Sequence, residues 1–280
     1  MELLDAQIIY HTKHVRPDDP TLSYEERISG AVEAARVSLD AVGVQAALLH
    51  NELPLVKLAC ERYPTRFGGV VAYTINDPIP DAEEAVGTVV ETPGLVAIRL
   101  IPGWPQDGRN LERLRSGAYD PLLAEAQKQG VPITFFMSGV LTDTHAVAQR
   151  FPELKLVIDH LGVLPAPEVP LVPERFDKLD ELLALAQYPN IAVKMTGTHS
   201  MTFEPFPFSD LWPYLHRVLD TFGTDRVVWG SDFVRASPLN TYADAVRFIL
   251  ETDEISPAEK KQITNTSVRT WFDWNPTDPQ

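Results

Sequence analysis

Short apolar runs rich in β-branched residues alternate along the chain with amphipathic stretches of helical period. The apolar runs lie at 3–10, 44–50, 68–74, 95–101, 131–137, 154–160, 191–197 and 226–232. Between them, stretches such as DPLLAEAQKQG and LWPYLHRVLDTFG place apolar residues three and four positions apart, and several end with Gly or Pro. The pattern therefore predicts eight successive βα units.

A closed barrel is the architecture that these units favour. Runs such as LKLVID are apolar at consecutive positions, which is typical of parallel strands covered on both faces. Eight units within 280 residues fit a single (β/α)8 TIM barrel over residues 1–274, followed by a flexible tail over 275–280. A doubly wound open sheet is the alternative. Its dinucleotide-binding form would carry a Gly-rich turn after the first strand, where the sequence instead runs YHTKHVRP.

Composition and charge exclude several kinds of partner. A formal net charge of −15 repels phosphate backbones, so we expect no nucleic-acid partner. No apolar run approaches the ~20 residues that span a bilayer, and the N-terminus lacks a signal-like pattern, so we expect no membrane contact and a cytoplasmic location. The single cysteine, Cys60, rules out an internal disulfide and a multi-cysteine metal site. Assembly into a homo-oligomer is left open.

Candidate site residues are polar residues where the strands end, because a barrel carries its chemistry on that face. In chain order they are Asp5, Gln7, His11, His14, His50, Asn51, Tyr73, Thr74, Arg99, Ser138, Asp159, His160, Lys194, Thr196, His199, Ser231 and Asp232. Trp104, just beyond the fourth run, is added as a stacking residue. The Pro-rich loop 164–174 and the aromatic loop 202–213 lie on the same face and are expected to wall a substrate pocket.

Several motifs carry a resemblance to a known family. VIDHLG, VKMTG and VVWGSDF occur in this order, with AIRL before them and ITNTSVRTWF after them. With the opening DAQII, the set resembles the amidohydrolase-related (amidohydrolase 2) family over nearly the whole chain. Within that family, chains of this length are similar to 2-pyrone-4,6-dicarboxylate lactonase and sugar lactonases. The resemblance implies the same barrel, hydrolytic chemistry, and a site that includes His160 and Asp232.

The family's metal site is where this chain departs from the resemblance. Gln7 and Ile9 stand at the two positions where the family has strand-1 histidines. Isoleucine cannot ligate a metal, and glutamine is a poor ligand for zinc-like ions. Only His160 and Asp232 remain of a ligand set that needs at least three protein groups. We therefore predict a metal-free site and no cofactor.

Roles follow for the residues at the heart of the predicted site. Asp232 is predicted to be the general base, with burial raising the pKa of its carboxyl into a useful range. His160 and Arg99 are predicted to polarise a substrate carbonyl. The structural alternatives are an Asp232 that bonds loop amides and a His160 that packs in the core. Arg99 could instead pair with Asp5 inside the barrel. Strand alternation is expected to turn Asp159 away from His160.

The remaining candidates are predicted to bind substrate. They are Gln7, His11, His50, Tyr73, Trp104, Lys194 and His199, with Thr196 as a further rim residue. Gln7 is assigned as a hydrogen-bond donor. Lys194 has a salt bridge within the barrel as its alternative role. His11 and His14 form a His-x-x-His pair, which is the alternative source of metal ligands.

Three functions compete on these residues. The first is metal-independent hydrolysis of a lactone or a related small cyclic ester. The second is lyase, isomerase, cyclase or decarboxylase chemistry on the same metal-free scaffold, and the third is a barrel that binds a ligand without turnover. The aromatic loop 202–213 favours an apolar or aromatic cyclic substrate. No Gly-x-Ser-x-Gly motif is present, so a serine hydrolase finds no support.

Overall fold

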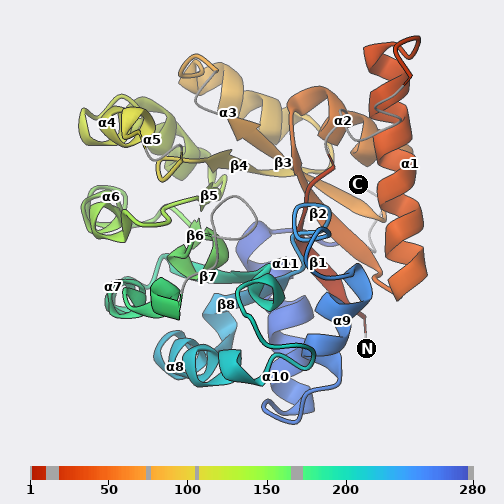
Figure 1. Cartoon of the computed structure of the whole chain (residues 1–280). Helices are drawn as coiled ribbons and strands as arrows, with labels where there is room; N and C mark the ends of the chain where they lie inside the picture. Colours follow the sequence, from red (N-terminus) through yellow and green to blue (C-terminus); the bar gives the residue numbers. More distant parts are fainter. Residues whose placement is uncertain (1, 11–18, 74–76, 105–106, 165–172, 277–280) are drawn as a thin grey trace.

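A parallel eight-stranded sheet forms the centre of the protein, in a computed structural model that describes residues 2–10, 19–73, 77–104, 107–164 and 173–276. Neighbouring strands follow chain order, which confirms the predicted (β/α)8 TIM barrel (Figure 1). The strands are β1 (Leu4–Ile8), β2 (Ala46–Asn51), β3 (Phe67–Tyr73), β4 (Leu95–Leu100), β5 (Ile133–Phe135), β6 (Leu156–Ile158), β7 (Ile191–Thr196) and β8 (Val227–Gly230). Residues 277–280 of the predicted tail lie outside the described ranges.

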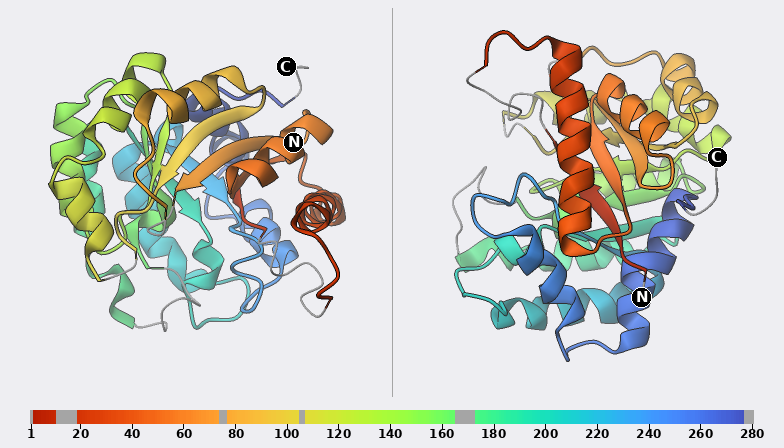
Figure 2. Two further views of the ribbon diagram at one scale, coloured as in Figure 1. Left: turned by 90° about the horizontal axis from the view of Figure 1, so that it is seen from above. Right: turned by 90° about the vertical axis from the view of Figure 1, so that its right-hand side faces the viewer.

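Helices surround the sheet and cover its outer face (Figure 1). They are α1 (Tyr24–Val42), α2 (Leu53–Arg62), α3 (Ala82–Glu91), α4 (Arg109–Arg115), α5 (Asp120–Gln129), α6 (Thr144–Arg150), α7 (Leu179–Leu183), α8 (Trp212–Phe222), α9 (Tyr242–Leu250), α10 (Pro257–Lys261) and α11 (Ser267–Phe272). Figure 2 shows α1 running along the outside of β1 and β2. Within the described ranges, no helix is long and apolar enough to cross a membrane.

The local sequence explains how the helices form and attach. In α8 the buried side chains recur at the three- and four-residue spacing of one helix face, at Trp212, Leu215, Val218, Leu219 and Phe222. α1 begins with a capping box, in which the Glu26 amide donates to Ser23 Oγ and the Ser23 amide donates to Glu26 Oε2. It ends at Gly43, whose φ of 73° is the left-handed conformation that glycine adopts without strain.

The lower part of the barrel interior is apolar and closed. Interior residues of the strands, including Leu4, Leu48, Val157 and Val228, form one buried cluster with residues of α11. Trp271 and Phe272 of that helix and Trp274 just after it belong to the same cluster. Lys194 Nζ lies 5.7 Å from the centre of the Phe272 ring, so the polar part of the barrel interior begins directly against this cluster.

Two strands end earlier than the sequence pattern predicts. The apolar runs 131–137 and 154–160 predict seven-residue strands, whereas β5 and β6 are three residues long. After β6 the chain enters a 3₁₀ turn, Asp159–Gly162, in which His160 and Leu161 have φ values of 54° and 56°. The left-handed turn takes the backbone out of the ladder, so the end of this run belongs to the mouth of the barrel.

The seam between β8 and β1 is closed by residues just beyond the end of β8. The Asp232 amide donates to the Gln7 carbonyl at 2.8 Å, and the Val234 amide donates to the Ile9 carbonyl at 3.0 Å. β1 itself has a register shift between Asp5 and Ile8. Irregularities of this kind re-aim a side chain near a functional site. Here Gln7 reaches the barrel interior although Asp5, two residues earlier, faces α9.

Asp5 holds this seam together with one buried carboxylate. Its Oδ1 accepts the amides of Gln7 at 3.0 Å and Ser231 at 2.9 Å, and its Oδ2 accepts the Tyr242 hydroxyl at 2.8 Å. The predicted pairing of Asp5 with Arg99 is therefore wrong, because Asp5 lies on the outer face of β1. Burial raises the pKa of Asp5 to about 6, although these three hydrogen bonds oppose the rise.

We expect this raised pKa to make stability depend on pH. The unfolded chain loses the Asp5 proton near its ordinary value of 3.8, and the folded chain retains it to about 6. The contribution is therefore complete below pH 4 and is lost as the pH rises to 6, by about 3 kcal/mol. This pH-dependent contribution to stability should be absent in Asp5→Asn, whose side-chain oxygen can still accept both amides. Urea unfolding at pH 4 and pH 7 should show wild type losing stability relative to Asp5→Asn, and a difference that is constant with pH contradicts this account.

Candidate active site

Both predicted catalytic residues lie at strand ends and adopt the left-handed conformation. His160 follows β6 with a φ of 54°, and Asp232 follows β8 with a φ of 57°. For a residue other than glycine this backbone conformation costs about 1–3 kcal/mol. It persists where the surrounding structure fixes it, and it is common at functional sites. Both side chains are buried, and His160 Nδ1 lies 3.7 Å from Asp232 Oδ2. The structure thus brings together the two residues singled out by their motifs.

Gln7 lies between these two residues and a buried lysine. Its Nε2 donates to Asp232 Oδ1 at 2.9 Å and lies 3.4 Å from His160 Nε2. Its Oε1 accepts a hydrogen bond from Lys194 Nζ at 3.0 Å. Gln7 and Lys194 are both fully buried. The predicted substrate donor Gln7 therefore has protein partners at both ends of its amide.

Lys194 belongs to a buried ion-pair network with Asp159 and Arg99. Lys194 Nζ is 3.0 Å from Asp159 Oδ1, and Arg99 Nε is 2.7 Å from Asp159 Oδ2. The salt bridge that was the alternative role of Lys194 is present. The prediction that Asp159 faces away from the site is wrong. Val157 faces the barrel interior, so strand alternation turns Asp159, two residues later, inward as well. The left-handed turn that follows β6 ends the alternation, so His160 lies on the same side as Asp159.

Asp232 is held in its ionised form by its neighbours. Burial alone raises the pKa of the carboxyl, but Arg235 and the Gln7 amide lower it below its ordinary value. Arg235 Nε binds Asp232 Oδ2, and the Arg235 side chain is only 10 % exposed. The predicted rise in the Asp232 pKa is therefore wrong, because the sequence reasoning counted apolar walls and missed the arginine three residues later. Gly197 makes room for this pair, since a Cβ there would lie 2.7 Å from Arg235 Nη2.

His160 is neutral and its tautomer is fixed by the backbone. Its Nδ1 lies 3.1 Å from the Thr196 carbonyl, which can only accept, so Nδ1 carries the proton. Nε2 is then a lone pair directed at the Gln7 amide. Burial lowers the pKa of His160 to about 4, and Asp232 only partly opposes this. An unprotonated Nε2 cannot donate to a carbonyl oxygen, so this tautomer does not provide the predicted polarising role.

A cavity of about 500 Å³ opens beside this network at the ends of β2, β3 and β4. Three predicted binding residues, His50, Tyr73 and Arg99, line it together with Ile9 and Asn51. His50 is buried, and its Nε2 lies 3.1 Å from the Ala6 carbonyl and 3.3 Å from Lys194 Nζ. Its Nδ1 has no partner among the described residues. The cavity therefore offers the Arg99 cation to a ligand, and the buried His50 imidazole lies in its wall.

The other predicted binding residues are placed less centrally. His199 is buried on the side of Asp232 and Arg235, and burial together with Arg235 lowers its pKa to about 4. Trp104 is half-buried beyond β4, and no contact among the described residues joins its ring to the network. His11 and His14 lie outside the described residues, as does most of the predicted wall 164–174.

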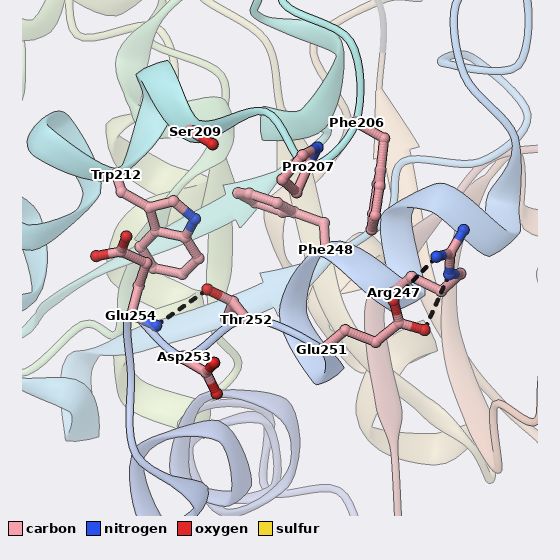
Figure 3. Close-up of a pocket in the computed structure, with 10 residues that line it drawn as sticks. All are labelled: Phe206, Pro207, Ser209, Trp212, Arg247, Phe248, Glu251, Thr252, Asp253 and Glu254. Carbon is pink, nitrogen blue, oxygen red and sulfur yellow. Dashed lines mark hydrogen bonds and ion pairs between the residues drawn. The ribbon is translucent and has the colours of Figure 1, made fainter.

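The aromatic loop after β7 packs against α9 rather than around the 500 Å³ cavity. Phe208 and Trp212 are buried, and both rings contact Phe248. Phe206, Trp212 and Phe248 border a separate pocket of about 280 Å³, whose rim carries Arg247 and three carboxylates of residues 251–254 (Figure 3). None of the predicted site residues lines this pocket. Phe208 and Trp212 therefore have a packing role, whereas Phe203 of the same loop is exposed.

Sequence reasoning gave no role to two residues that shape the mouth. Arg235 neutralises Asp232, and its signal in the sequence is a cation three residues after the predicted base. Phe136 follows β5 and stands between His160, at 5.5 Å between ring centres, and the Arg99 guanidinium, at 5.7 Å from its ring. Only Ser138 is a candidate at the end of that run, because the strand was expected to continue through Phe136.

The described residues do not fit the family's metal site. No three His, Cys, Asp or Glu side chains among them gather closely enough to hold a metal ion. The N–H groups of Gln7 point at His160 and Asp232, the two remaining candidate ligands. Arg235 holds the second Asp232 oxygen. Each ligand atom thus already faces a hydrogen-bond donor.

The barrel and these strand-end residues define a class of proteins. A match to the amidohydrolase family covers residues 13–269, so the chain belongs to that family of enzymes. This confirms the resemblance drawn from the motifs.

Individual relatives share less with the chain. It is 32% identical over 123 residues to an L-fucono-1,5-lactonase of Burkholderia ambifaria, a match that spans 41% of this chain and only 40% of that relative's length. A zinc-bound amidohydrolase from Burkholderia multivorans is similar in structure, with a TM-score of 0.75 at 18% identity over 98% of this chain and all of that one. A probable 2-pyrone-4,6-dicarboxylic acid hydrolase from Acinetobacter baumannii, with citric acid bound, gives 0.71 at 16% identity over the same shares. These two likenesses show the fold.

Proposed function

We propose that the protein hydrolyses a lactone, or a closely related small cyclic ester, without a metal ion. The observation that carries the proposal is an ionised carboxylate, Asp232, held in a strained backbone conformation at the mouth of the barrel. The name of the B. ambifaria relative supports a lactone as the substrate class. The small-molecule cavity next to Arg99 supports a substrate of that size.

In this proposal Asp232 removes a proton from the attacking water. Both carboxylate oxygens already accept one hydrogen bond, from Gln7 and Arg235, and each has a second lone pair for a water. The attack leaves a negative charge on the carbonyl oxygen of the substrate. The site contains more positive than negative groups. Its two carboxylates are Asp159 and Asp232, and its three cations are Arg99, Lys194 and Arg235. This excess of positive charge stabilises the oxyanion in a site that excludes water.

Arg99 is the residue proposed to face that oxyanion, because it is the cation that lines the cavity. Asp159 fixes its Nε, which leaves the outer guanidinium nitrogens to be directed at the ligand. His160 helps to orient the base through the Gln7 amide, whose N–H group its Nε2 accepts, rather than polarising the carbonyl. The roles predicted for Asp232 and Arg99 are kept, and that of His160 is changed by its tautomer.

Metal independence gives the test of this proposal. Protein purified without added metal and treated with a chelator should open L-fucono-1,5-lactone or 2-pyrone-4,6-dicarboxylate at the same rate as untreated protein, because no step needs a metal. Acid release at constant pH measures the reaction, and elemental analysis of the same sample measures bound metal. Stoichiometric zinc or manganese, with activity that chelation abolishes and metal restores, would contradict the metal-free proposal.

Lyase or isomerase chemistry is separated from hydrolysis by the same assay run in ¹⁸O-labelled water. Hydrolysis places one labelled oxygen in the product carboxylate, because the attacking water becomes part of it. A product without the label shows that the site carries out another reaction. Binding without any turnover supports the non-catalytic alternative.

A further inference from the structure

We infer that the carboxamide of Gln7 is a positioning residue that fixes Asp232 and His160 relative to each other, in the place where the family's metal would join them. Three contacts of one amide carry the inference: Nε2 to Asp232 Oδ1 at 2.9 Å, Nε2 to His160 Nε2 at 3.4 Å, and Lys194 Nζ to Oε1 at 3.0 Å. The role differs from the substrate donor that the sequence predicts.

The partners permit only one orientation of this amide. Lys194 can only donate, so the atom facing it is the amide oxygen. Asp232 is ionised and can only accept, and His160 presents a lone pair because its proton lies on Nδ1. In the flipped orientation the amide oxygen would face two acceptors, Asp232 Oδ1 and His160 Nε2, and the amide nitrogen would face the Lys194 ammonium, which is a donor. No hydrogen bond could then form at any of the three contacts. Both amide hydrogens are consequently committed, and none remains for a substrate.

The backbone of β1 is built to deliver Gln7 to this position. The register shift between Asp5 and Ile8 turns the side chain into the barrel, and Asp5 Oδ1 accepts the Gln7 amide at 3.0 Å. Gly230 of β8 allows the close approach of β1, since a Cβ there would lie 2.9 Å from the backbone nitrogen of Gln7. Two elements of the fold thus support one buried side chain.

Lys194 completes the arrangement behind Gln7. The ammonium is fully buried and touches Gln7 Oε1, Asp159 and His50. A cation on the oxygen polarises the amide and strengthens the hydrogen bonds that its N–H groups donate. The pair Gln7 and Lys194 therefore presents partial positive charge to His160 and Asp232 through two N–H groups.

The decisive experiment replaces Gln7 with a residue of the same length that cannot donate. Gln7→Met fills the space and removes all three bonds, and Gln7→Glu keeps an acceptor for Lys194 but removes both donors. Asn190→Leu is the matched control, because Asn190 Nδ2 donates to the Phe151 and Leu154 carbonyls far from the mouth. The kinetic readout rests on the proposed lactone hydrolysis, so a second readout is independent of turnover.

That second readout is the ring nitrogen signals of His160 in long-range ¹H–¹⁵N NMR, assigned with His160→Gln among the seven histidines of the chain. Loss of the Gln7 donor should move the Nε2 signal of His160 in both Gln7 variants and leave it in place in Asn190→Leu. In the kinetic readout, kcat per folded molecule should fall roughly 100-fold with KM little changed, because misplacement of the base affects the chemical step.

Three results would overturn the inference. An unchanged kcat per folded molecule means that Gln7 only fills space, and a raised KM with normal kcat means that it binds substrate. An unmoved Nε2 signal means that the amide does not bond His160, whatever the activity. If wild-type protein opens no lactone at all, the proposed hydrolysis fails while the NMR arm still decides the role of Gln7.

Discussion

Replacing Asp232 with Asn should lower kcat for lactone opening by about 10³-fold, the central value for loss of a general base. Asn has nearly the same shape, so KM and the cavity beside Arg99 should change little. The reaction should lose its base because an amide cannot take up the proton of the attacking water. Initial rates with saturating and limiting substrate separate the two constants.

The outcome has a structural confounder that a control resolves. Asp232 neutralises the buried Arg235, so the variant also loses an ion pair and some stability. Rates are therefore compared per folded molecule, with folding measured by circular dichroism. Asp220→Asn, on the exposed face of α8, changes the same charge away from the site and should keep full activity. A fully active Asp232→Asn variant would remove Asp232 from the role of base.

Replacing Asp159 with Ala should destabilise the protein by about 3–5 kcal/mol, as expected when one partner of a buried ion pair is removed. Asp159 and Lys194 are fully buried, and the side chain of Arg99 is 11 % exposed. Without the carboxylate, the two cations face each other in a low-dielectric interior. Urea unfolding, monitored by fluorescence, measures the change in the free energy of unfolding.

A double variant separates the ion pair from simple loss of packing. Asp159→Ala combined with Lys194→Met removes both charges and should be more stable than the sum of the two single changes predicts, by about 1–3 kcal/mol of coupling. Strict additivity of the two changes, or a loss below about 1 kcal/mol for Asp159→Ala, contradicts the claim that this pair is a buried network.

The fold could be predicted from the sequence because its main determinant is local. The apolar runs indicate buried strands and the amphipathic stretches indicate helices, each from its own residues alone. Eight such units in one chain of 280 residues leave the barrel as the simplest arrangement. The ends of β5 and β6 could not be placed, since apolar residues such as Phe136 continue past the last ladder hydrogen bond to line the mouth. Hydrophobicity alone does not distinguish a strand from the buried turn that follows it.

The location of the candidate site could be predicted from the sequence, but the hydrogen bonds and ion pairs within it could not. His160 and Asp232 were found because polar residues at strand ends converge in any barrel. The partner of each depended on features without a sequence signal: the register shift in β1 that turns Gln7 inward, and the left-handed turn that brings Asp159 and His160 to the same side. The direction in which the pKa of a buried carboxyl shifts also depends on such partners, as the effect of Arg235 on Asp232 shows.

The most direct test of the metal-free hydrolase is one rate measurement on protein shown by elemental analysis to hold no metal. The opening of L-fucono-1,5-lactone in ¹⁸O-labelled water is followed by mass spectrometry for wild type and for Asp232→Asn. The account predicts rapid formation of singly labelled hydroxy acid by wild type and a rate near background for the variant. Activity that appears only when zinc is added, or that is equal in the two proteins, would contradict it.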